Sequence, residues 1–433
     1  MNDFRKVIKN VSWIIVCKVI QSFIALFMSM ITARYLGPSN YGLISYASSI
    51  VAFVVPIAQL GIRNILVEEI INFPEREGAT LGTSLFMTIV TSIFCIIGCI
   101  TFVGVVNAGE KDTLIVCALF SVSLIFQMAE MIQYWYQAKL LSKYTSILSL
   151  VAYLLVAIYK IWLLVTGKNV YWFAISYAFD SFLISFGLFV IYKRLGKQKL
   201  SISVLLAKEM LAKSKYYIIS NMMVTVFSQT DKIMIKLING NVENGYYSTA
   251  FTCACMLSFI YGAVIDSLRP VIFSSKKISQ IKFEINIVLL YSIIICMGLV
   301  QGIIMTMFAY PIINVLYGND YLGAVPVLRV LTWYLPFSYM GTIRNIWMLA
   351  EKKYQFLWKI NLFGAISNVL CNYFLIPLYG AVGAAVATVI TQFFTNVIMC
   401  FIVKSIRPTF KLITQSLNPK ILLRIARTIR KIR

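Results

Sequence analysis

The residues of this sequence best suited to chemistry are charged side chains inside long apolar segments. A charge in hydrocarbon is costly, so such a residue usually faces a protein interior or a wet cavity and marks a functional site. The acidic ones are Glu130, Asp180, Asp231 and Asp266. The basic ones outnumber them and are Lys18, Arg34, Arg63, Lys160, Lys232, Lys236, Arg269, Arg329, Arg344 and Lys359. A positive interior favours an anionic ligand, because guanidinium and ammonium groups bind phosphate oxygens.

The acids are candidates for binding a proton or a sodium ion. Asp180 is the first choice, because it lies in the middle of its apolar segment, far from either membrane surface. Asp231, Glu130 and Asp266 are the others. Structural alternatives exist for two of them. Asp180 could pair with a lysine inside the membrane, and Asp266 could pair with Arg269, three residues later.

Several kinds of chemistry are excluded by what the sequence lacks. It has no histidine, which removes histidine-based catalysis and most zinc sites. Its nine cysteines do not show the CxxC spacing of a metal or redox site. It has no GxxxxGK[ST] loop, so the chain is not expected to hydrolyse ATP. We expect no cofactor, no metal site and no enzymatic activity.

The elements that hold these charges are predicted to be transmembrane helices. Hydrophobic residues make up 60% of the chain and charged residues 13%. Apolar runs of about 20 residues or more recur, and each is long enough to cross a hydrocarbon core as a helix. The predicted fold class is an all-α integral membrane protein with about 12 transmembrane helices. They are expected at residues 11–35, 43–66, 80–106, 113–137, 145–166, 170–192, 214–238, 244–273, 284–309, 324–350, 355–377 and 381–403.

Lysine and arginine gather on one side of these helices, which predicts their orientation. An even number of spans places both termini on that side, together with the basic stretch from Lys193 to Lys215. The opposite loops hold only Lys111 and Lys168. Both termini are therefore predicted to be cytoplasmic. The net charge of +23 then faces anionic lipid rather than nucleic acid. No cleavable signal peptide is expected, because the first apolar run is too long for one.

The two halves of the chain are predicted to be repeats of each other. GLISYA begins at Gly42 and GYYSTA at Gly245, roughly 200 residues apart, and each follows an apolar span and a glycine-containing turn. Arg63 and Arg269 end the spans that come next. Both halves start in the cytoplasm, so two parallel six-helix lobes should surround a central cavity.

Four parts are expected along the chain. The segment between the lobes should form an amphipathic helix on the inner leaflet, because Ile202, Leu205 and Leu211 can share one face. The C-terminal tail repeats this pattern with Ile421 and Ile425 beside several arginines. The four parts are a first lobe (1–192), a cytoplasmic connector (193–213), a second lobe (214–403) and a basic cytoplasmic tail (404–433).

Two stretches resemble signatures of the bacterial oligosaccharide-lipid flippases. ARYLGPSNYGLISYAS, Ala33 to Ser48, resembles their first-loop signature, and SQTDKIMIKLINGNVENGYYSTA, Ser228 to Ala250, resembles their seventh-helix motif. The family exports lipid-linked repeat units of O-antigen and capsule, and it belongs to the superfamily of multidrug, oligosaccharidyl-lipid and polysaccharide exporters. The resemblance covers nearly the whole chain. It implies a polyprenyl diphosphate that bears a short glycan as cargo, flipped by alternating access in the bacterial inner membrane.

The resemblance also implies roles for individual residues and partners. In the related lipid II flippase, basic residues of helices one, two and eight line the cavity, and those helices carry Lys18, Arg63 and Arg269 here. We predict that Arg63 and Arg269 grip the diphosphate from symmetric positions with help from Lys18, although that relative has arginine at the first position. Arg344 and Lys232 are further cavity candidates. H+ or Na+ is the expected coupling ion, and membrane lipids and a polysaccharide polymerase are the expected partners.

Two alternatives stay open on the sequence. A multidrug or ion antiporter of the same superfamily would favour an acidic cavity for cationic drugs, which the basic excess argues against. A membrane-embedded polysaccharide polymerase or acyltransferase would need a sizeable outer loop, and the longest one runs only from about Tyr310 to Gly323. The missing histidine also argues against acyl transfer.

Overall fold

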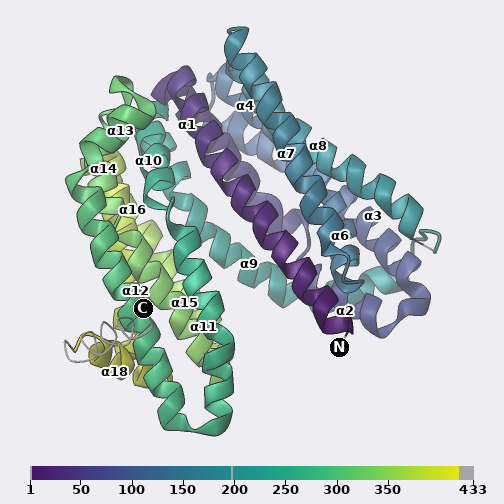
Figure 1. The fold of residues 1–433 in the computed structure, drawn as a ribbon. Coiled ribbons are helices and arrows are strands. Elements are labelled where there is room, and N and C mark those ends of the chain that lie inside the picture. Colours follow the sequence, from purple (N-terminus) through teal and green to yellow (C-terminus); the bar gives the residue numbers. More distant parts are fainter. Residues whose placement is uncertain (1, 197, 419–433) are drawn as a thin grey trace. The chain divides into compact units, whose positions relative to one another are not determined.

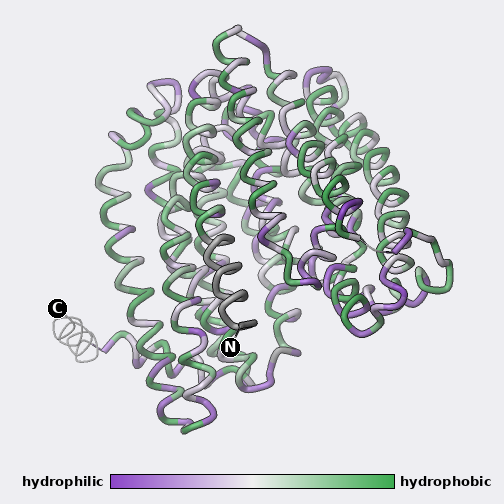
Figure 2. Tube along the Cα trace, turned by 45° about the vertical axis from the view of Figure 1, so that its right-hand side comes forward, coloured by the Kyte–Doolittle hydropathy of each residue, from purple (hydrophilic) through white to green (hydrophobic). Residues whose placement is uncertain are grey.

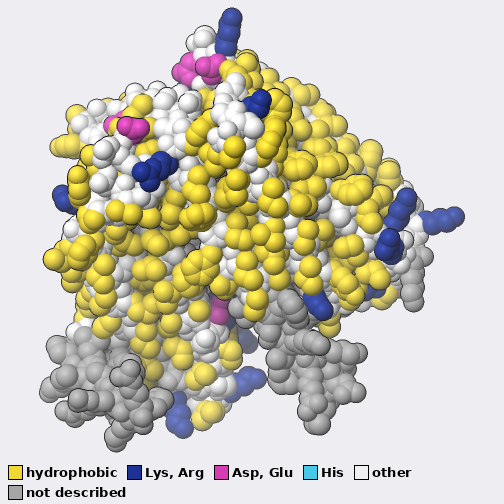
Figure 3. All heavy atoms as spheres, turned by 45° about the horizontal axis from the view of Figure 1, so that its top comes forward, with side chains coloured by type: hydrophobic (Ala, Val, Ile, Leu, Met, Phe, Trp, Pro, Cys, Tyr) yellow, Lys and Arg dark blue, Asp and Glu magenta, His cyan; other side chains and the backbone are white. Residues whose placement is uncertain are grey.

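The part of the chain that the structure describes is helical and contains no β-strand (Figure 1). The structure is a computed structural model that describes residues 2–196 and 198–418, with side chains from Val16 onward and Tyr354 excepted. Hydrophobic side chains cover most of the face drawn in Figure 3, as expected of helices that face lipid. These observations confirm the predicted all-α membrane fold class.

Seven helical segments of the described residues are long and apolar enough to cross a membrane. An eighth is reached if α10 (Asn241–Ala254) and α11 (Ser258–Ile278), which meet at 41°, count as one span. Apolar residues run along these segments, and hydrophilic residues concentrate at the turns between them (Figure 2). The chain is therefore a multi-pass membrane protein, and the count of about 12 spans stays a prediction. The seven segments are Val16–Asn72, Pro74–Val106, Lys111–Ala138, Ser142–Val165, Val170–Leu195, Gln280–Met307 and Leu357–Ile402.

Two of the longest helices are broken by a glycine where the sequence predicted a loop. Gly37 interrupts α1 (Asn2–Ala58) with φ 72° and ψ 170°. Gly380 interrupts α16 (Leu357–Phe393) with φ 56° and ψ −135°. Residues that carry a Cβ rarely adopt a positive φ. Glycine therefore permits a sharp break in the helix that would strain other residues. Each of these helices can therefore hold two crossings.

Contacts divide the chain into two compact units, which are considered separately. Unit 1 (Met1–Ile233) is built around a cluster in which Tyr46, Phe120 and Phe173 are fully buried. The hydroxyl of Tyr46 donates a hydrogen bond to Oδ1 of Asn107 over 2.8 Å. Besides α1, unit 1 contains α2 (Arg63–Asn72), α3 (Glu77–Val106), α4 (Lys111–Ser121), α5 (Ser123–Phe126), α6 (Glu130–Ala138), α7 (Ser142–Val165), α8 (Val170–Leu195) and most of α9 (Val204–Asn239).

Unit 2 (Met234–Arg433) has its own core, in which Tyr261, Tyr291 and Trp347 are buried. Its last described helix packs on α12, where Ser292 donates a hydrogen bond to the carbonyl oxygen of Ser416 over 2.9 Å. The predicted tail helix at 419–433 lies outside the described residues. Besides α10, α11 and α16, unit 2 contains α12 (Gln280–Met307), α13 (Ala309–Tyr317), α14 (Ala324–Leu331), α15 (Tyr334–Ala350), the π-helix Phe394–Ile398, α17 (Met399–Ile402) and α18 (Arg407–Ser416).

The segment between α8 and α9 is extended and lies against the start of α3. Gln198 accepts a hydrogen bond from the backbone N–H of Gly78 over 2.9 Å, and the N–H of Ser203 donates to Thr83 over 3.0 Å. A Cβ on Gly78 or Gly82 would run into carbonyl oxygens of this segment. Helix α9 then continues without a break to Asn239, so the predicted connector helix and seventh span form one helix. The lobe boundaries stay a prediction.

Two glycines at corresponding positions of the predicted repeat share one backbone conformation. Gly37 has φ 72° and ψ 170°, and Gly240 has φ 89° and ψ −174°. The two glycines lie in the corresponding turns LGPSNYG and LINGNVENG, each directly before a buried helix. Gly318, with φ 90° and ψ 178°, has the same conformation, so the conformation marks the start of a helix and the repeat stays a prediction.

Candidate functional site

Arg63 is presented by a sharp turn in unit 1. Helix α1 ends at Ala58, and Leu60 and Gly61 both have a positive φ before α2 begins at Arg63. The guanidinium lies over the ring of Tyr134 at 5.3 Å from the centroid, and the arginine is exposed. A ring attracts a cation through its π face, without occupying the N–H groups. In the sequence, Arg63 is a candidate because of its place at the end of a predicted span. Its contact with the ring of Tyr134 is seen only in the fold.

Glu130 lies beside this arginine without pairing directly with it. Its carboxylate accepts hydrogen bonds from Nε2 of Gln59 over 2.8 Å and from the hydroxyl of Tyr134 over 3.3 Å. Arg63 acts on Glu130 through its charge alone. The arginine is thus held near a negative charge while its N–H donors meet no carboxylate among the described residues. Such donors can bind two oxygens of a phosphate.

Arg269 has a different environment in unit 2. It lies within α11 directly before Pro270, and its Nη2 pairs with Oδ1 of Asp266 at 3.4 Å. Both side chains are exposed, so the pair contributes roughly 0–1 kcal/mol. An arriving phosphate could displace such a partner easily. The structure thus contains the predicted Asp266–Arg269 pair, which is the structural alternative to ligand binding.

Arg344 is buried, at 3% exposed, in the core of unit 2. Its Nη1 donates to the carbonyl oxygen of Thr395 over 2.7 Å and to Oδ1 of Asn396 over 3.0 Å. Nε and Nη2 both donate to Oδ1 of Asn345. The π-helix at Phe394–Ile398 presents the first two of these acceptors. Neutral oxygens therefore surround this guanidinium, and its predicted role in cargo binding stays a prediction.

The remaining candidates lie on α1 and α9. Lys18 is exposed on α1. Asp231 is buried, at 5% exposed, and Lys232 is half-buried next to it on α9. Both α9 residues take part in interactions with other described residues. The structure brings Arg63 and Glu130 together, and Arg269 and Asp266 together, and the roles of Lys18, Lys232 and Asp231 stay predictions.

In the sequence, Lys160 is one of several basic residues within apolar segments. In the structure it lies on a cavity inside unit 1. The cavity measures about 140 Å³ and lies among α1, α7 and α8. The ammonium is 4.7 Å from the ring centroid of Tyr177. Asp180 acts on it electrostatically. The sequence offered a lysine as partner for Asp180, but it could not show a cavity formed by three helices.

Ion pairs in each unit link helices or helix ends that are distant in the sequence. In unit 1, Lys139 pairs with Glu77 at 2.5 Å and Lys213 with Glu69 at 2.6 Å. The hydrogen bond to Glu69 raises the pKa of Lys213 above its ordinary value.

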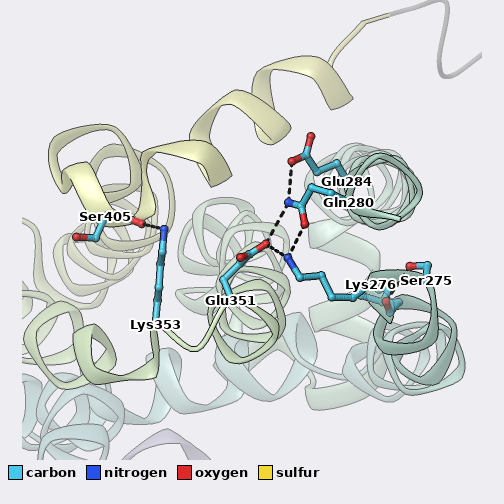
Figure 4. Close-up of polar contacts among 8 residues, drawn as sticks. Ser275, Lys276, Gln280, Glu284, Glu351, Lys353 and Ser405 are labelled. Carbon is cyan, nitrogen blue, oxygen red and sulfur yellow. Dashed lines mark hydrogen bonds and ion pairs between the residues drawn. The ribbon is translucent and has the colours of Figure 1, made fainter. Parts of the chain in front are cut away.

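In unit 2, Lys276 pairs with Glu351, and Gln280 donates to the same carboxylate over 3.1 Å (Figure 4). Burial raises the pKa of Glu351, but the hydrogen bonds from Lys276 and Gln280 outweigh it, so the pKa lies below its usual value. The ammonium of Lys353 donates to the carbonyl oxygen of Ser405 over 2.8 Å, which ties the turn after α15 to the start of α18 (Figure 4).

Comparison with known sequences gives a family match and two relatives. The family described as polysaccharide biosynthesis protein matches residues 7–276. The capsular polysaccharide biosynthesis protein CapF of Staphylococcus aureus is 22% identical over 394 residues, which cover 89% of this chain and 96% of the relative. An uncharacterised membrane protein of Methanocaldococcus jannaschii is 27% identical over 256 residues, which cover 57% of this chain. This match spans 49% of the archaeal protein, about half its length.

Solved transporter structures share the fold. The lipid II flippase MurJ in an inward closed conformation matches with a TM-score of 0.72 and 16% identity, over 93% of this chain and 90% of that one. A multidrug resistance MATE family transporter of the MOP superfamily in an inward-facing conformation matches with a TM-score of 0.66 and 13% identity, over 92% and 96%. At such identities the likeness establishes the architecture.

Proposed function

This chain belongs to the polysaccharide biosynthesis protein family, and from that premise we propose that it flips polyprenyl-diphosphate-linked oligosaccharide repeat units across a membrane. The cargo would move from the cytoplasmic to the outer leaflet for the synthesis of a surface polysaccharide such as O-antigen or capsule. The capsular relative and the fold shared with a lipid II flippase support this reading.

The environment of Arg63 carries the proposal. Its guanidinium is exposed, rests on the ring of Tyr134, and meets no carboxylate among the described residues. Planar N–H donors that are held in place and left open suit the oxygens of a diphosphate. Arg269 would be the second contact, released from Asp266 when the cargo arrives. Lys18 would assist from α1.

Alternating access would carry the cargo, and an ion gradient would drive it. H+ or Na+ remains the expected coupling ion. Asp180 is the first candidate for binding it, because it is a carboxylate within α8 that has an oxygen buried without a hydrogen-bond partner among the described residues. The protein would work in the bacterial inner membrane with both termini in the cytoplasm, and it would hand its product to a polysaccharide polymerase.

Reconstitution into liposomes tests the proposal. Transfer of a polyprenyl-diphosphate glycan to the outer leaflet would be followed together with efflux of a cationic dye. We expect glycan-lipid movement without dye efflux, and we expect Arg63→Ala to slow that movement. Dye efflux without glycan-lipid movement would instead favour the multidrug antiporter, whose fold this chain shares. If Asp180→Asn still responds fully to the ion gradient, the coupling role of this carboxylate is wrong.

The polymerase or acyltransferase alternative has less support. The longest predicted outer loop folds as α13 and a short 3-10 helix at Asn319–Tyr321. This segment therefore offers little open chain for a catalytic site. A change in glycan chain length in the liposome assay, with only this protein present, would favour the polymerase.

A further inference from the structure

The cavity beside Lys160 is polar although it lies among membrane-spanning helices. Six of its lining side chains carry a hydroxyl or an ammonium group, and the others are apolar. Bilayer-embedded segments have little water with which to satisfy polar groups, so each unpaired group costs free energy. The polar lining side chains are Ser29, Thr32, Tyr41, Tyr153, Lys160 and Tyr177.

Several of these groups have no hydrogen-bond partner among the described residues. Oγ1 of Thr32 is buried without one, and that residue is 7% exposed. Lys160 lies over the ring of Tyr177 but meets no acceptor. Ser29 and Tyr41 pair with each other at 2.7 Å. The cavity therefore offers open donors to a ligand.

The charge of the cavity indicates a neutral ligand. Asp180 balances the ammonium of Lys160 electrostatically, but the two form no ion pair. One carboxylate oxygen of Asp180 is buried without a hydrogen-bond donor. The two opposite charges offset each other, so an anion would gain little net electrostatic attraction there. A neutral group with both donors and acceptors could instead hydrogen-bond to the lysine and the hydroxyls.

The aromatic lining of the cavity favours a ring over an open chain. The side chains of Tyr41, Tyr153, Phe173 and Tyr177 all line it, and the ring of Tyr177 is fixed by Phe120 at 4.3 Å between centroids. Aromatic faces suit the apolar face of a sugar ring. A volume of about 140 Å³ equals roughly five water molecules at about 30 Å³ each, well below the 300–1,000 Å³ of drug-sized pockets.

We propose that this cavity binds a single neutral sugar residue of the lipid-linked glycan, held by Lys160 and Thr32 against the tyrosine rings. The proposal rests on the proposed function and adds a glycan contact that is separate from the arginines assigned to the diphosphate. Flipping should then depend on this cavity only when the lipid carries sugars.

The test compares two cargoes in the liposome assay: a polyprenyl-diphosphate glycan and polyprenyl diphosphate without sugar. Lys160→Met should slow movement of the glycan lipid about tenfold, as expected when a charged hydrogen bond is lost, and Thr32→Val should slow it less, because a neutral hydrogen bond is weaker. Movement of the bare lipid should change little. Lys168→Met is the matched control, because this lysine also lies near aromatic rings, those of Trp162 and Trp172, but not on the cavity. Equal slowing of both cargoes, or slowing of neither, would overturn the proposal.

A binding measurement separates failure of the cavity from failure of the flippase function. Saturation-transfer NMR on the purified protein would use methyl glucoside, methyl galactoside and methyl N-acetylglucosaminide as probes. We expect a signal from at least one probe that Lys160→Met abolishes and Lys168→Met retains. If the wild-type protein moves neither lipid but shows this signal, the flippase function is wrong and the sugar site stands. Absence of a signal from all three probes would overturn the sugar site.

Discussion

Two membrane-embedded cations of unit 1 and two of unit 2 are held in different ways. In unit 1, Arg63 and Lys160 lie against tyrosine rings and keep open N–H donors. In unit 2, Arg269 pairs with a carboxylate and Arg344 is surrounded by amide and carbonyl oxygens. An aromatic ring positions a cation while leaving its donors for a ligand, whereas an oxygen acceptor uses them. On the proposed function, this difference predicts that Arg63 contributes more to cargo binding than Arg269 does, and that Arg344 contributes to stability.

The turn contacts show a second difference between the units. Lys139 follows α6 and pairs with Glu77, whereas Glu351 follows α15 and pairs with Lys276. The next residues, Leu140 and Lys352, share a positive φ of 57° and 56°. The two units therefore have the same kind of turn and the same kind of contact, with the signs of the charges reversed.

The largest expected effect is on the stability of unit 2. Arg344→Met should lower the free energy of unfolding by about 3 kcal/mol, because it leaves the buried acceptors at Thr395 and Asn396 without their donor. Thermal unfolding in detergent measures this loss. Arg329→Ala, at an exposed position of the same unit, should have little effect. If Arg344→Met keeps full stability but no longer flips the glycan lipid, Arg344 contacts the cargo instead of stabilising unit 2.

The next effect separates the two phosphate candidates. Arg63→Ala should slow glycan-lipid movement about thirtyfold, since a charged, two-point contact is worth roughly 2 kcal/mol. Arg269→Ala should slow it only about threefold, because Asp266 already competes for its donors. Rates in liposomes at matched protein density give the comparison. Equal effects at both positions would remove the asymmetry between the units, and normal rates for both would rule out the diphosphate role.

A smaller effect tests the reversed ion pairs. Lys139→Glu should destabilise unit 1 by about 1 kcal/mol, because it faces the buried Glu77 with a like charge from a partly exposed position. Adding Glu77→Lys recreates the charge order of unit 2 and should recover most of the loss. A double-mutant cycle on thermal unfolding measures the coupling. If the double variant is no more stable than the single one, the two turns are not equivalent.

The smallest effect is a pH dependence that differs between the units. The pKa of Glu351 is depressed in the folded protein, so its contribution to stability is present above the unfolded value of about 4.5 and is lost as the pH falls through the folded value. The pKa of Lys213 is raised, so its contribution is present below about 10.5 and is lost as the pH rises through the folded value. Glu351→Gln should therefore flatten only the acid side of a stability profile.

Much of the fold could be predicted from the sequence, because the hydropathy of a segment and the backbone freedom of a glycine are both local properties. The apolar runs predicted the helices, and the LGPSNYG turn predicted the break that the structure places at Gly37. The end of the connector could not be predicted, because nothing in the local pattern separates 204–213 from the apolar run that follows.

The site was predictable as a set of charges, but its environments were not. Arg63 was recognised by its type and its place in the repeat. Its support by Tyr134 depends on the angle between α2 and α6, which no spacing encodes. Lys160 lines the cavity together with a tyrosine from a second helix and a threonine from a third, and local spacing does not show that these three helices meet. Burial of Arg344 likewise depends on a π-helix some fifty residues further along the chain.

The extended segment between α8 and α9 has a practical consequence for labelling this protein. By composition it is a polar loop, the usual place for an epitope tag or a protease site. Its backbone nevertheless fills the space over Gly78 and Gly82 and exchanges hydrogen bonds with α3. An insertion there would pull this segment away from α3. A reporter group inserted beside Gly109 would meet open space, because nothing lies within 4 Å of a Cβ built there, and it would leave that glycine with its positive φ in place.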